Sequence, residues 1–292
     1  MEVADVDVIQ GLFFHFKMPI SALERKLKSP PKQGRVLFCF DVANPPMTPV
    51  RPFKIRFTKW ISRHLPDAIV YRFLIARSTI PKQKIFQEGF RAADPAKTAL
   101  DIGANRGIVS YFMSKRFPKI HSFEPNADLN VFLKKVLPSN CILHTCALSQ
   151  AVGESELSVV MESGIPIHGR GSILTVREES QSYAVQKIQV ETLDSQGLKN
   201  IGFIKIDVEG HEEKVIRGGT STLRENKPVL IIEIEKRHAH KPVRETLDLI
   251  LSLGYDGYFF EGELRRPVSE YQESMQDPGY PYYVNDFLFL PK

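Results

Sequence analysis

The chain has 292 residues and a net charge of +5, with 42% hydrophobic and 25% charged residues. This composition is typical of a globular protein with one large domain and an extension, and it excludes low-complexity and repeat classes. No apolar run approaches the roughly 20 residues of a membrane span, and the three cysteines lack paired metal spacing, so we expect a cytoplasmic protein.

The N-terminal region carries the excess of positive charge. Nine basic residues and one acid, Asp67, lie between Arg51 and Lys84, which gives this segment +8 and leaves −3 for the rest of the chain. Basic and apolar residues alternate there until Pro66 interrupts them, which predicts two short amphipathic elements. We interpret residues 1–93 as an accessory region whose basic face is either solvated or a surface for an anionic partner or a membrane.

An apolar strand is predicted over residues 98–102, followed by a glycine-containing turn and a helix over about residues 107–117. A buried strand that turns sharply into a helix needs residues without a Cβ at the turn. Such a turn presents free backbone N–H groups at the carboxyl edge of a sheet. The dinucleotide fingerprint would have glycine where Asp101 stands, and a carboxylate there suits a ligand with amine and hydroxyl groups better than a diphosphate.

Two later strands are also predicted to end in acids. Residues 119–124 form the second strand of a βαβ unit and end at Glu124, which is followed by Pro125. An acid at that position can accept hydrogen bonds from both hydroxyl groups of a ribose. A third strand, over residues 202–207, ends at Asp207 and is followed by Gly210 and a helix.

Taken together, these motifs resemble those of the FkbM family of S-adenosylmethionine-dependent methyltransferases. The resemblance covers residues 97–292 and implies a class I α/β fold: a Rossmann-like seven-stranded sheet with an antiparallel last strand, in a catalytic domain of residues 94–292. It implies S-adenosylmethionine as the cofactor. The motifs are Asp101-Ile-Gly-Ala-Asn-Arg-Gly, Phe123-Glu-Pro-Asn, Ala147-Leu-Ser, Val190-Glu-Thr-Leu-Asp and Lys205-Ile-Asp-Val-Glu-Gly-His-Glu. The cofactor contacts that we predict are Asp101, Gly103, Asn105, Gly107, Glu124, Pro125, Ala147 and Asp207.

The remaining elements alternate as expected for a parallel sheet, apart from one antiparallel pair. Between the two strands of that pair, residues 163–172 are rich in glycine, which predicts an irregular loop that could cover the cofactor. Three side chains of this loop could contact the substrate or could lie on its surface without a function: His168, Arg170 and Ser172. Helices are predicted near 85–93, 127–136, 209–218 and 246–253, further strands near 141–146, 229–235, 255–260 and 284–290, and the antiparallel pair near 156–161 and 186–191.

The candidates for catalysis follow two strand ends. A hydroxyl acceptor must lose a proton, and we predict Asp207, His211 and Glu233 as the residues that carry the chemistry. His211 could instead cap a helix. Glu233 and Glu235 should share one face of their strand and could bind Mg²⁺ with Asp207, but the expected metal spacing is missing, so we predict no metal. The same stretch also supplies Glu209, Glu212, Arg237, His238 and His240.

The resemblance implies O-methylation of a hydroxyl on a sugar, a glycan or a small natural product, and the basic extension suggests an acceptor with negative charge. Alternatives are N-methylation of a sugar or peptide amine, and a non-catalytic scaffold that binds the cofactor and docks through the extension.

Asn44-Pro-Pro-Met47 resembles a turn of nucleic-acid amino-methyltransferases. Met47 replaces the aromatic residue that would stack on a base, so we expect no nucleic-acid partner.

Overall fold

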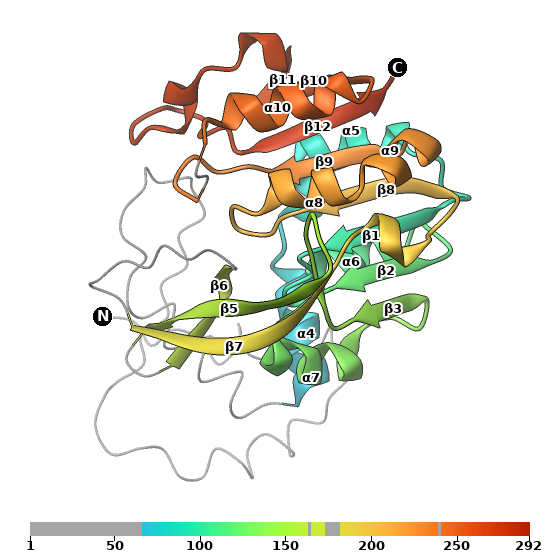
Figure 1. Ribbon diagram of the computed structural model, residues 1–292, viewed down its shortest axis with the longest axis vertical. Helices are drawn as coiled ribbons and strands as arrows, with labels where there is room; N and C mark the ends of the chain where they lie inside the picture. Colours follow the sequence, from blue (N-terminus) through green and yellow to red (C-terminus); the bar gives the residue numbers. More distant parts are fainter. Residues whose placement is uncertain (1–65, 163–164, 173–181, 239–240) are drawn as a thin grey trace, which may run out of the picture. The chain divides into compact units, whose positions relative to one another are not determined.

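The computed structural model describes residues 66–162, 165–172, 182–238 and 241–292 (Figure 1). All of them belong to one compact unit that begins at Thr58. The predicted turn at residues 44–47 and the basic residues between Arg51 and Arg63 lie outside the described part of the chain. Across the described residues, every helix is too short or too polar to span a membrane.

An eight-stranded sheet in the order β11-β10-β12-β9-β8-β1-β2-β3 forms the centre of the fold (Figure 1). Strands β3, β2, β1, β8 and β9 run parallel, and β12 inserts antiparallel between β9 and β10. This confirms the predicted seven-stranded arrangement, to which the short edge strand β11 adds an eighth strand. The strands are β1 (Thr98–Ile102), β2 (Ile120–Phe123), β3 (Cys141–His144), β8 (Ile201–Ile206), β9 (Val229–Glu233), β10 (Tyr255–Glu261), β11 (Leu264–Pro267) and β12 (Asp286–Pro291).

Helices cover both faces of this sheet, which is why β8 is buried along its whole length. Apolar residues of α5 and α6 pack with Phe203 and Ile231 in one core. Those of α8, α9 and α10 pack with Leu230 and Ile232 in the other. The helices are α4 (Asp67–Ala76), α5 (Lys84–Ala92), α6 (Ile108–Ser114), α7 (Ala127–Val136), α8 (Glu212–Gly218), α9 (Thr220–Asn226) and α10 (Val243–Ser252).

The described end of the predicted accessory region packs on this sheet domain. Helix α4 begins directly after Pro66, and its Tyr71 hydroxyl donates a 2.7 Å hydrogen bond to the Gly107 carbonyl at the start of α6. Lys135 in α7 forms a 2.8 Å ion pair with Asp67, the first residue of α4. The division of the chain at residue 93 stays a prediction.

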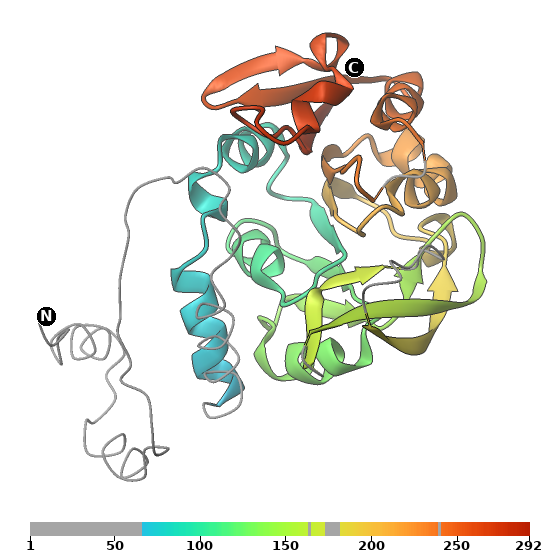
Figure 2. The same ribbon diagram turned by 90° about the vertical axis from the view of Figure 1, so that its left-hand side faces the viewer.

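A second sheet, in the order β4-β7-β5-β6, lies beside the carboxyl ends of β1 and β2 (Figure 2). Its strands are β4 (Ala147–Leu148), β5 (Gly153–Glu162), β6 (Ile165–Ser172) and β7 (Ser182–Glu191). The pairing of β5 with β7 confirms the predicted antiparallel pair. The prediction of an irregular loop is wrong for residues 165–172, which form β6 and pair antiparallel with β5. Pairing with β6 provides hydrogen-bond partners for the backbone N–H and C=O groups on the edge of β5 that does not face β7. This gain outweighs the low strand propensity of the glycines in β6.

Candidate functional site

The turn between β1 and α6 is held between two neighbouring strands. The Gly103 N–H donates a 3.0 Å hydrogen bond to the Phe123 carbonyl at the end of β2. Gly103 has a φ of +81°, and a Cβ at this position would lie 1.8 Å from the Asp207 carbonyl oxygen that follows β8. Only glycine fits both constraints, so the predicted role of this residue in the turn is explained by close backbone packing.

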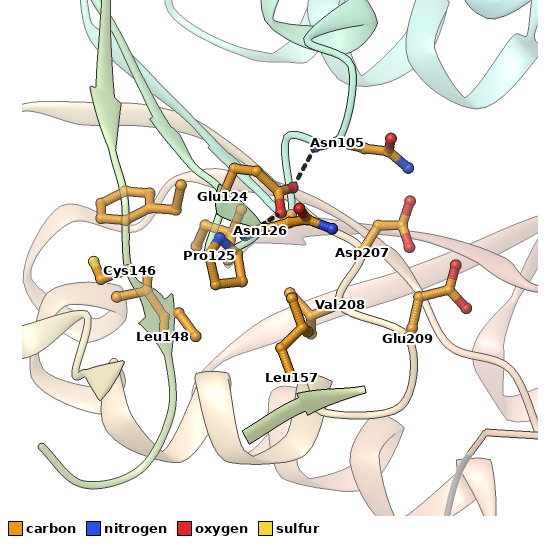
Figure 3. Close-up of a pocket in the computed structure, with 14 residues that line it drawn as sticks. Asn105, Glu124, Pro125, Asn126, Cys146, Leu148, Leu157, Asp207, Val208 and Glu209 are labelled. Atoms are coloured by element: carbon orange, nitrogen blue, oxygen red, sulfur yellow. Dashed lines mark hydrogen bonds between the residues drawn. The ribbon is translucent and has the colours of Figure 1, made fainter. Parts of the chain in front are cut away.

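Glu124 fixes the turn from the end of β2 (Figure 3). Its Oε2 accepts a 2.7 Å hydrogen bond from the Asn105 N–H, and its Oε1 accepts one of 2.9 Å from the Asn126 N–H. Burial raises the pKa of Glu124 to about 7, although the two backbone donors favour the ionised form. Each carboxylate oxygen keeps a second lone pair, so Glu124 can still accept hydrogen bonds from two hydroxyl groups of a ligand.

A cleft that is open to solvent lies beside this turn (Figure 3). One wall is apolar and includes Leu157 from β5 of the second sheet. The other side presents carboxylates and amides, an arrangement that suits a ligand with a flat apolar group and several hydroxyl or amine groups. The lining residues are Ile102, Gly103, Asn105, Phe123, Glu124, Pro125, Asn126, Cys146, Ala147, Leu148, Leu157, Asp207, Val208 and Glu209.

Two of the predicted cofactor residues lie outside this lining. Asp101 is fully buried, and its Oδ2 accepts a 2.5 Å hydrogen bond from the Ser110 hydroxyl, which ties β1 to α6. Burial raises the pKa of Asp101. Gly107 caps the N-terminus of α6. The contacts of both residues with a cofactor stay predictions, whereas the structure brings together at the cleft Gly103, Asn105, Glu124, Pro125, Ala147 and Asp207.

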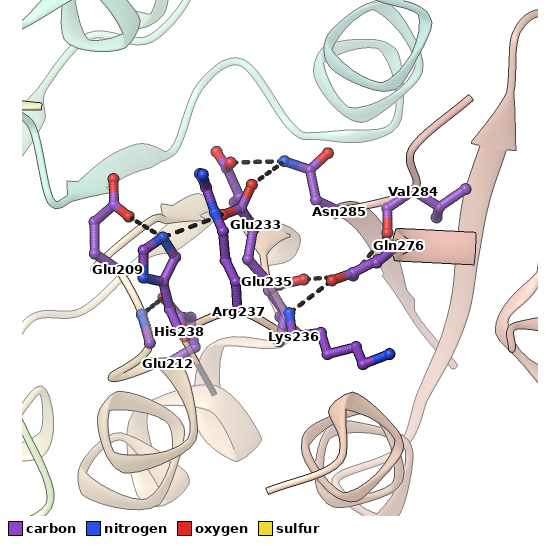
Figure 4. A network of polar contacts seen from close by, with 12 residues as sticks. Glu209, Glu212, Glu233, Glu235, Lys236, Arg237, His238, Gln276, Val284 and Asn285 are labelled. Atoms are coloured by element: carbon purple, nitrogen blue, oxygen red, sulfur yellow. Dashed lines mark hydrogen bonds and ion pairs between the residues drawn. The ribbon is translucent and has the colours of Figure 1, made fainter. Parts of the chain in front are cut away.

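Beyond the cleft, residues at the ends of β8 and β9 and at the start of β12 bring five carboxyl groups within electrostatic reach of one another. Figure 4 shows three of them, Glu209, Glu233 and Glu235. The Asn285 side-chain amide donates hydrogen bonds of 2.7 Å to Glu233 Oε1 and 3.3 Å to Glu235 Oε1. This shared donor places the two carboxylates on the same side, as predicted, although β9 ends at Glu233 and Glu235 lies beyond the strand. We call this group the acid cluster; it consists of Asp207, Glu209, Glu233, Glu235 and Asp286.

Burial and mutual repulsion keep part of the acid cluster protonated. Burial, together with the charges of Asp207 and Asp286, raises the pKa of Glu233 to about 9. Burial, together with the charges of Asp207 and Glu235, raises the pKa of Glu209 to about 7 and that of Asp286 to about 6. Groups with such pKa values can exchange protons near neutral pH, which is what a general acid or base must do.

The structure separates the two histidines that follow these strands. His211 is buried at the start of α8, where its Nε2 lies 2.8 Å from the Ser149 hydroxyl, and it does not line the cleft. Its role as a base stays a prediction. His238 reaches the acid cluster instead, with Nε2 3.1 Å from Glu209 Oε2 and 3.3 Å from Glu235 Oε2. The sequence placed both histidines near strand ends, but only the packing of the two loops decides which one reaches the carboxylates.

Glu212, the first residue of α8, has a structural role. Its Oε1 accepts hydrogen bonds of 3.2 Å from the Val208 N–H and 3.0 Å from the Gly210 N–H. These bonds close the loop between β8 and α8 and satisfy backbone donors near the helix N-terminus. The loop that presents Asp207 and Glu209 to the cleft is thereby fixed.

Among the described residues, one group could hold a metal ion. The ligand atoms of Glu209, Glu235 and His238 lie within 4.8 Å of one another. This set shares only Glu235 with the Mg²⁺ site considered from the sequence.

Comparison with known proteins identifies related sequences and folds. A family model described as the methyltransferase FkbM domain matches residues 101–256, which is more than half of the chain. No curated protein matches the chain.

Three solved structures are among those to which this chain is similar. A methyltransferase FkbM from Methylobacillus flagellatus is 14% identical, with 82% of this chain and 59% of that chain covered and a TM-score of 0.43. A TehB-like SAM-dependent methyltransferase from Corynebacterium glutamicum is 12% identical, with coverage of 82% and 100% and a TM-score of 0.41. A precorrin-6y C5,15-methyltransferase from Geobacter metallireducens is 15% identical, with coverage of 76% and 87% and a TM-score of 0.38. The chain therefore spans 59% of the length of the FkbM structure that it matches.

Proposed function

This chain belongs to the FkbM family of S-adenosylmethionine-dependent methyltransferases, and we propose that it transfers the methyl group to a hydroxyl of a sugar, a glycan or a small natural product. The observation that carries the proposal is the position of the acid cluster. Asp207 and Glu209 belong to it and also line the cleft, so groups that can take a proton adjoin the place where a cofactor would bind.

The residues of the cleft fit the cofactor. Glu124 retains lone pairs for the two ribose hydroxyls, and the apolar side chains of Phe123, Leu148 and Leu157 would hold the adenine. Asn105 and Asp207 would bind the polar amino-acid part. When bound, S-adenosylmethionine supplies a methyl group that its sulfonium already activates, so the main tasks of the protein are alignment and proton removal.

Proton removal from the acceptor is assigned to the acid cluster. A hydroxyl becomes a good nucleophile only when a base takes its proton. Asp207 lies at the border of the cleft and contributes to the raised pKa of Glu233. Glu233 already holds a proton near neutral pH, so Asp207 would take the proton of the acceptor and release it to solvent, to which its side chain is 30% exposed. This arrangement supports O-methylation.

N-methylation is the second candidate, and the charge of the same cluster favours it. Five acids face only two cations among the described neighbours, Lys205 and Arg237, so the region would attract an ammonium group. An amine acceptor also needs to lose a proton before it attacks, which makes proton acceptors useful in both reactions. The third alternative, a non-catalytic scaffold, predicts cofactor binding without turnover.

The test uses S-adenosylmethionine with a ¹³C-labelled methyl group and matched acceptors that differ in one group, such as a methyl glucoside and the corresponding 2-amino sugar, together with polyols and sugar phosphates. We expect a labelled methyl ether, identified by its carbon chemical shift, with Asp207→Asn as the inactive control. A product labelled on nitrogen establishes the second candidate. A lack of any labelled product across the panel, with the cofactor bound, would favour the scaffold.

A further inference from the structure

Three side chains from two loops converge on one point at the border of the cleft (Figure 4). Glu209 follows β8, whereas Glu235 and His238 follow β9. We propose that Glu209, Glu235 and His238 bind one divalent transition-metal ion. The inference deepens the proposed function, because the ion would lie where the acceptor hydroxyl must lose its proton.

The distances between the three groups fit a common ion. A zinc-type ion lies roughly 2.0–2.2 Å from nitrogen and oxygen ligands. Two such ligands at tetrahedral or octahedral angles are therefore about 3.0–3.5 Å apart. His238 Nε2 lies 3.1 Å from Glu209 Oε2 and 3.3 Å from Glu235 Oε2. Two of the three separations therefore match those around one bound ion, and all three ligand atoms lie within 4.8 Å of one another.

Hydrogen bonding alone does not explain this arrangement. His238 Nε2 is buried and lies within ion-pair distance of both carboxylates. One imidazole nitrogen carries at most one proton, whereas two carboxylates of like charge approach it. A cation placed between the three groups would attract all of them and would offset the excess negative charge of the acid cluster.

Both loops are fixed by contacts outside the proposed site. Gly210 has a φ of +95°, and a Cβ there would lie 2.3 Å from the His238 carbonyl oxygen, so the two loops touch through their backbones. Buried Gln276 accepts a 2.6 Å hydrogen bond from the Lys236 N–H and donates one of 2.8 Å to the Ile234 carbonyl. Ligands held by such supporting contacts lose little freedom when an ion binds.

The donor set indicates the class of ion. One imidazole nitrogen and two carboxylate oxygens suit Mn²⁺, Fe²⁺ or Zn²⁺, whereas Mg²⁺ prefers oxygen ligands alone. Three protein ligands leave coordination positions for water or substrate. A hydroxyl bound at such a position loses its proton more readily, which is the help that an unactivated sugar hydroxyl needs.

The test measures metal binding directly, so it does not depend on any methyl transfer. The full chain is freed of metal with EDTA, and MnCl₂ is titrated while electron paramagnetic resonance follows the free ion. We expect one bound Mn²⁺ per chain, displaced by Zn²⁺. Glu209→Gln and His238→Gln should each weaken the affinity by at least about tenfold. Glu245→Gln, which changes an exposed acid in α10, should leave the affinity unchanged.

Two further measurements keep the result decisive. Binding of S-adenosylmethionine and thermal melting show whether each variant is folded. If both variants fail to fold, pulsed electron paramagnetic resonance of the wild type decides, because bound Mn²⁺ should show coupling to a histidine nitrogen. The proposal is overturned if the wild type binds neither Mn²⁺ nor Zn²⁺, if folded variants bind as tightly as the wild type, or if the nitrogen coupling is absent. Metal binding without methyl transfer would leave this site standing and contradict the proposed function.

Discussion

Lys205 Nζ lies 2.9 Å from Asp207 Oδ2, and this ion pair connects the interior of the sheet with the border of the cleft. The Lys205 side chain is 8% exposed and that of Asp207 is 30% exposed. Burial disfavours the charge on Lys205, but Asp207 and Asp101 raise its pKa, so the ammonium stays charged inside the sheet. Asp207 therefore has a structural partner in addition to its proposed part in catalysis.

Replacing Asp207 should affect both stability and turnover. In Asp207→Asn the amide can still accept a hydrogen bond from Lys205 but no longer offsets its charge. We expect a loss of about 1–3 kcal/mol in the free energy of unfolding, less than for a fully buried pair because Asp207 is partly solvated. Methyl transfer should fall by about 100-fold or more. Urea denaturation and initial rates, measured below the melting transition, separate the two effects.

Lys205→Met provides the matched control for this pair. A double-mutant cycle of Asp207→Asn with Lys205→Met should give a coupling energy of about 1–3 kcal/mol in the free energy of unfolding. Turnover should remain low in the double variant, since restoring the charge balance does not replace the carboxylate. A single variant Asp207→Asn with a nearly normal rate would remove this residue from the proposed mechanism.

Gly103→Ala tests how closely the turn packs on the following strand. The new Cβ would lie 1.8 Å from the Asp207 carbonyl oxygen, and the backbone has a positive φ that alanine adopts only with strain. We expect the free energy of unfolding to fall by more than about 1–2 kcal/mol. Gly153→Ala is the control, because nothing lies within 4 Å of the Cβ that it adds. Equal melting temperatures for the two variants would contradict the packing of this turn.

The raised pKa of Glu233 predicts a dependence of stability on pH. A carboxyl group whose pKa rises from 4.5 to about 9 on folding binds its proton more tightly in the folded state. Its contribution to stability is complete below the lower pKa and is lost as the pH rises through the higher one. The wild type should therefore lose stability between about pH 5 and about pH 9 more steeply than Glu233→Gln, which cannot ionise. Urea denaturation at several pH values across this range measures the free energy of unfolding, with Glu154→Gln as the control. If the pKa of Glu233 is not raised, the free energies of the wild type and of Glu233→Gln should change with pH in parallel.

Much of the fold followed from local patterns in the sequence. Buried strands with continuous apolar character, a glycine turn and acids at strand ends identified the sheet and the residues Glu124 and Asp207 at its carboxyl edge. The direction of the Asp101 side chain was harder to predict, because it points inward and binds Ser110, which lies nine positions later in the chain. The group around His238 depends on two loops whose backbones touch, and no local pattern encodes such a contact. Strand β6 likewise depends on pairing with β5 rather than on its own propensity.

The basic segment predicts an effect of salt on the proposed reaction. Arg56, Lys59 and Arg63, which lie outside the described residues, belong to the segment between Arg51 and Lys84 that carries +8. If this segment attracts an anionic acceptor, the Michaelis constant should rise as the Debye length falls from about 10 Å at 0.1 M salt to about 3 Å at 1 M. Replacing these three residues by glutamine should flatten the dependence. A Michaelis constant that does not change with salt concentration would mean that the acceptor does not contact the segment.

Calorimetric titration of S-adenosylmethionine into the wild type and into Glu124→Gln tests the central claim most directly, with Glu154→Gln in β5 as the control and thermal melting as a check on folding. The account predicts micromolar affinity, about −8 kcal/mol, for the wild type and the control. The variant should bind about 1.5–3 kcal/mol more weakly, because a neutral amide replaces the carboxylate that accepts hydrogen bonds from the ribose. Binding of NADH in place of S-adenosylmethionine, or an unchanged affinity in folded Glu124→Gln, would contradict the assignment of this cleft.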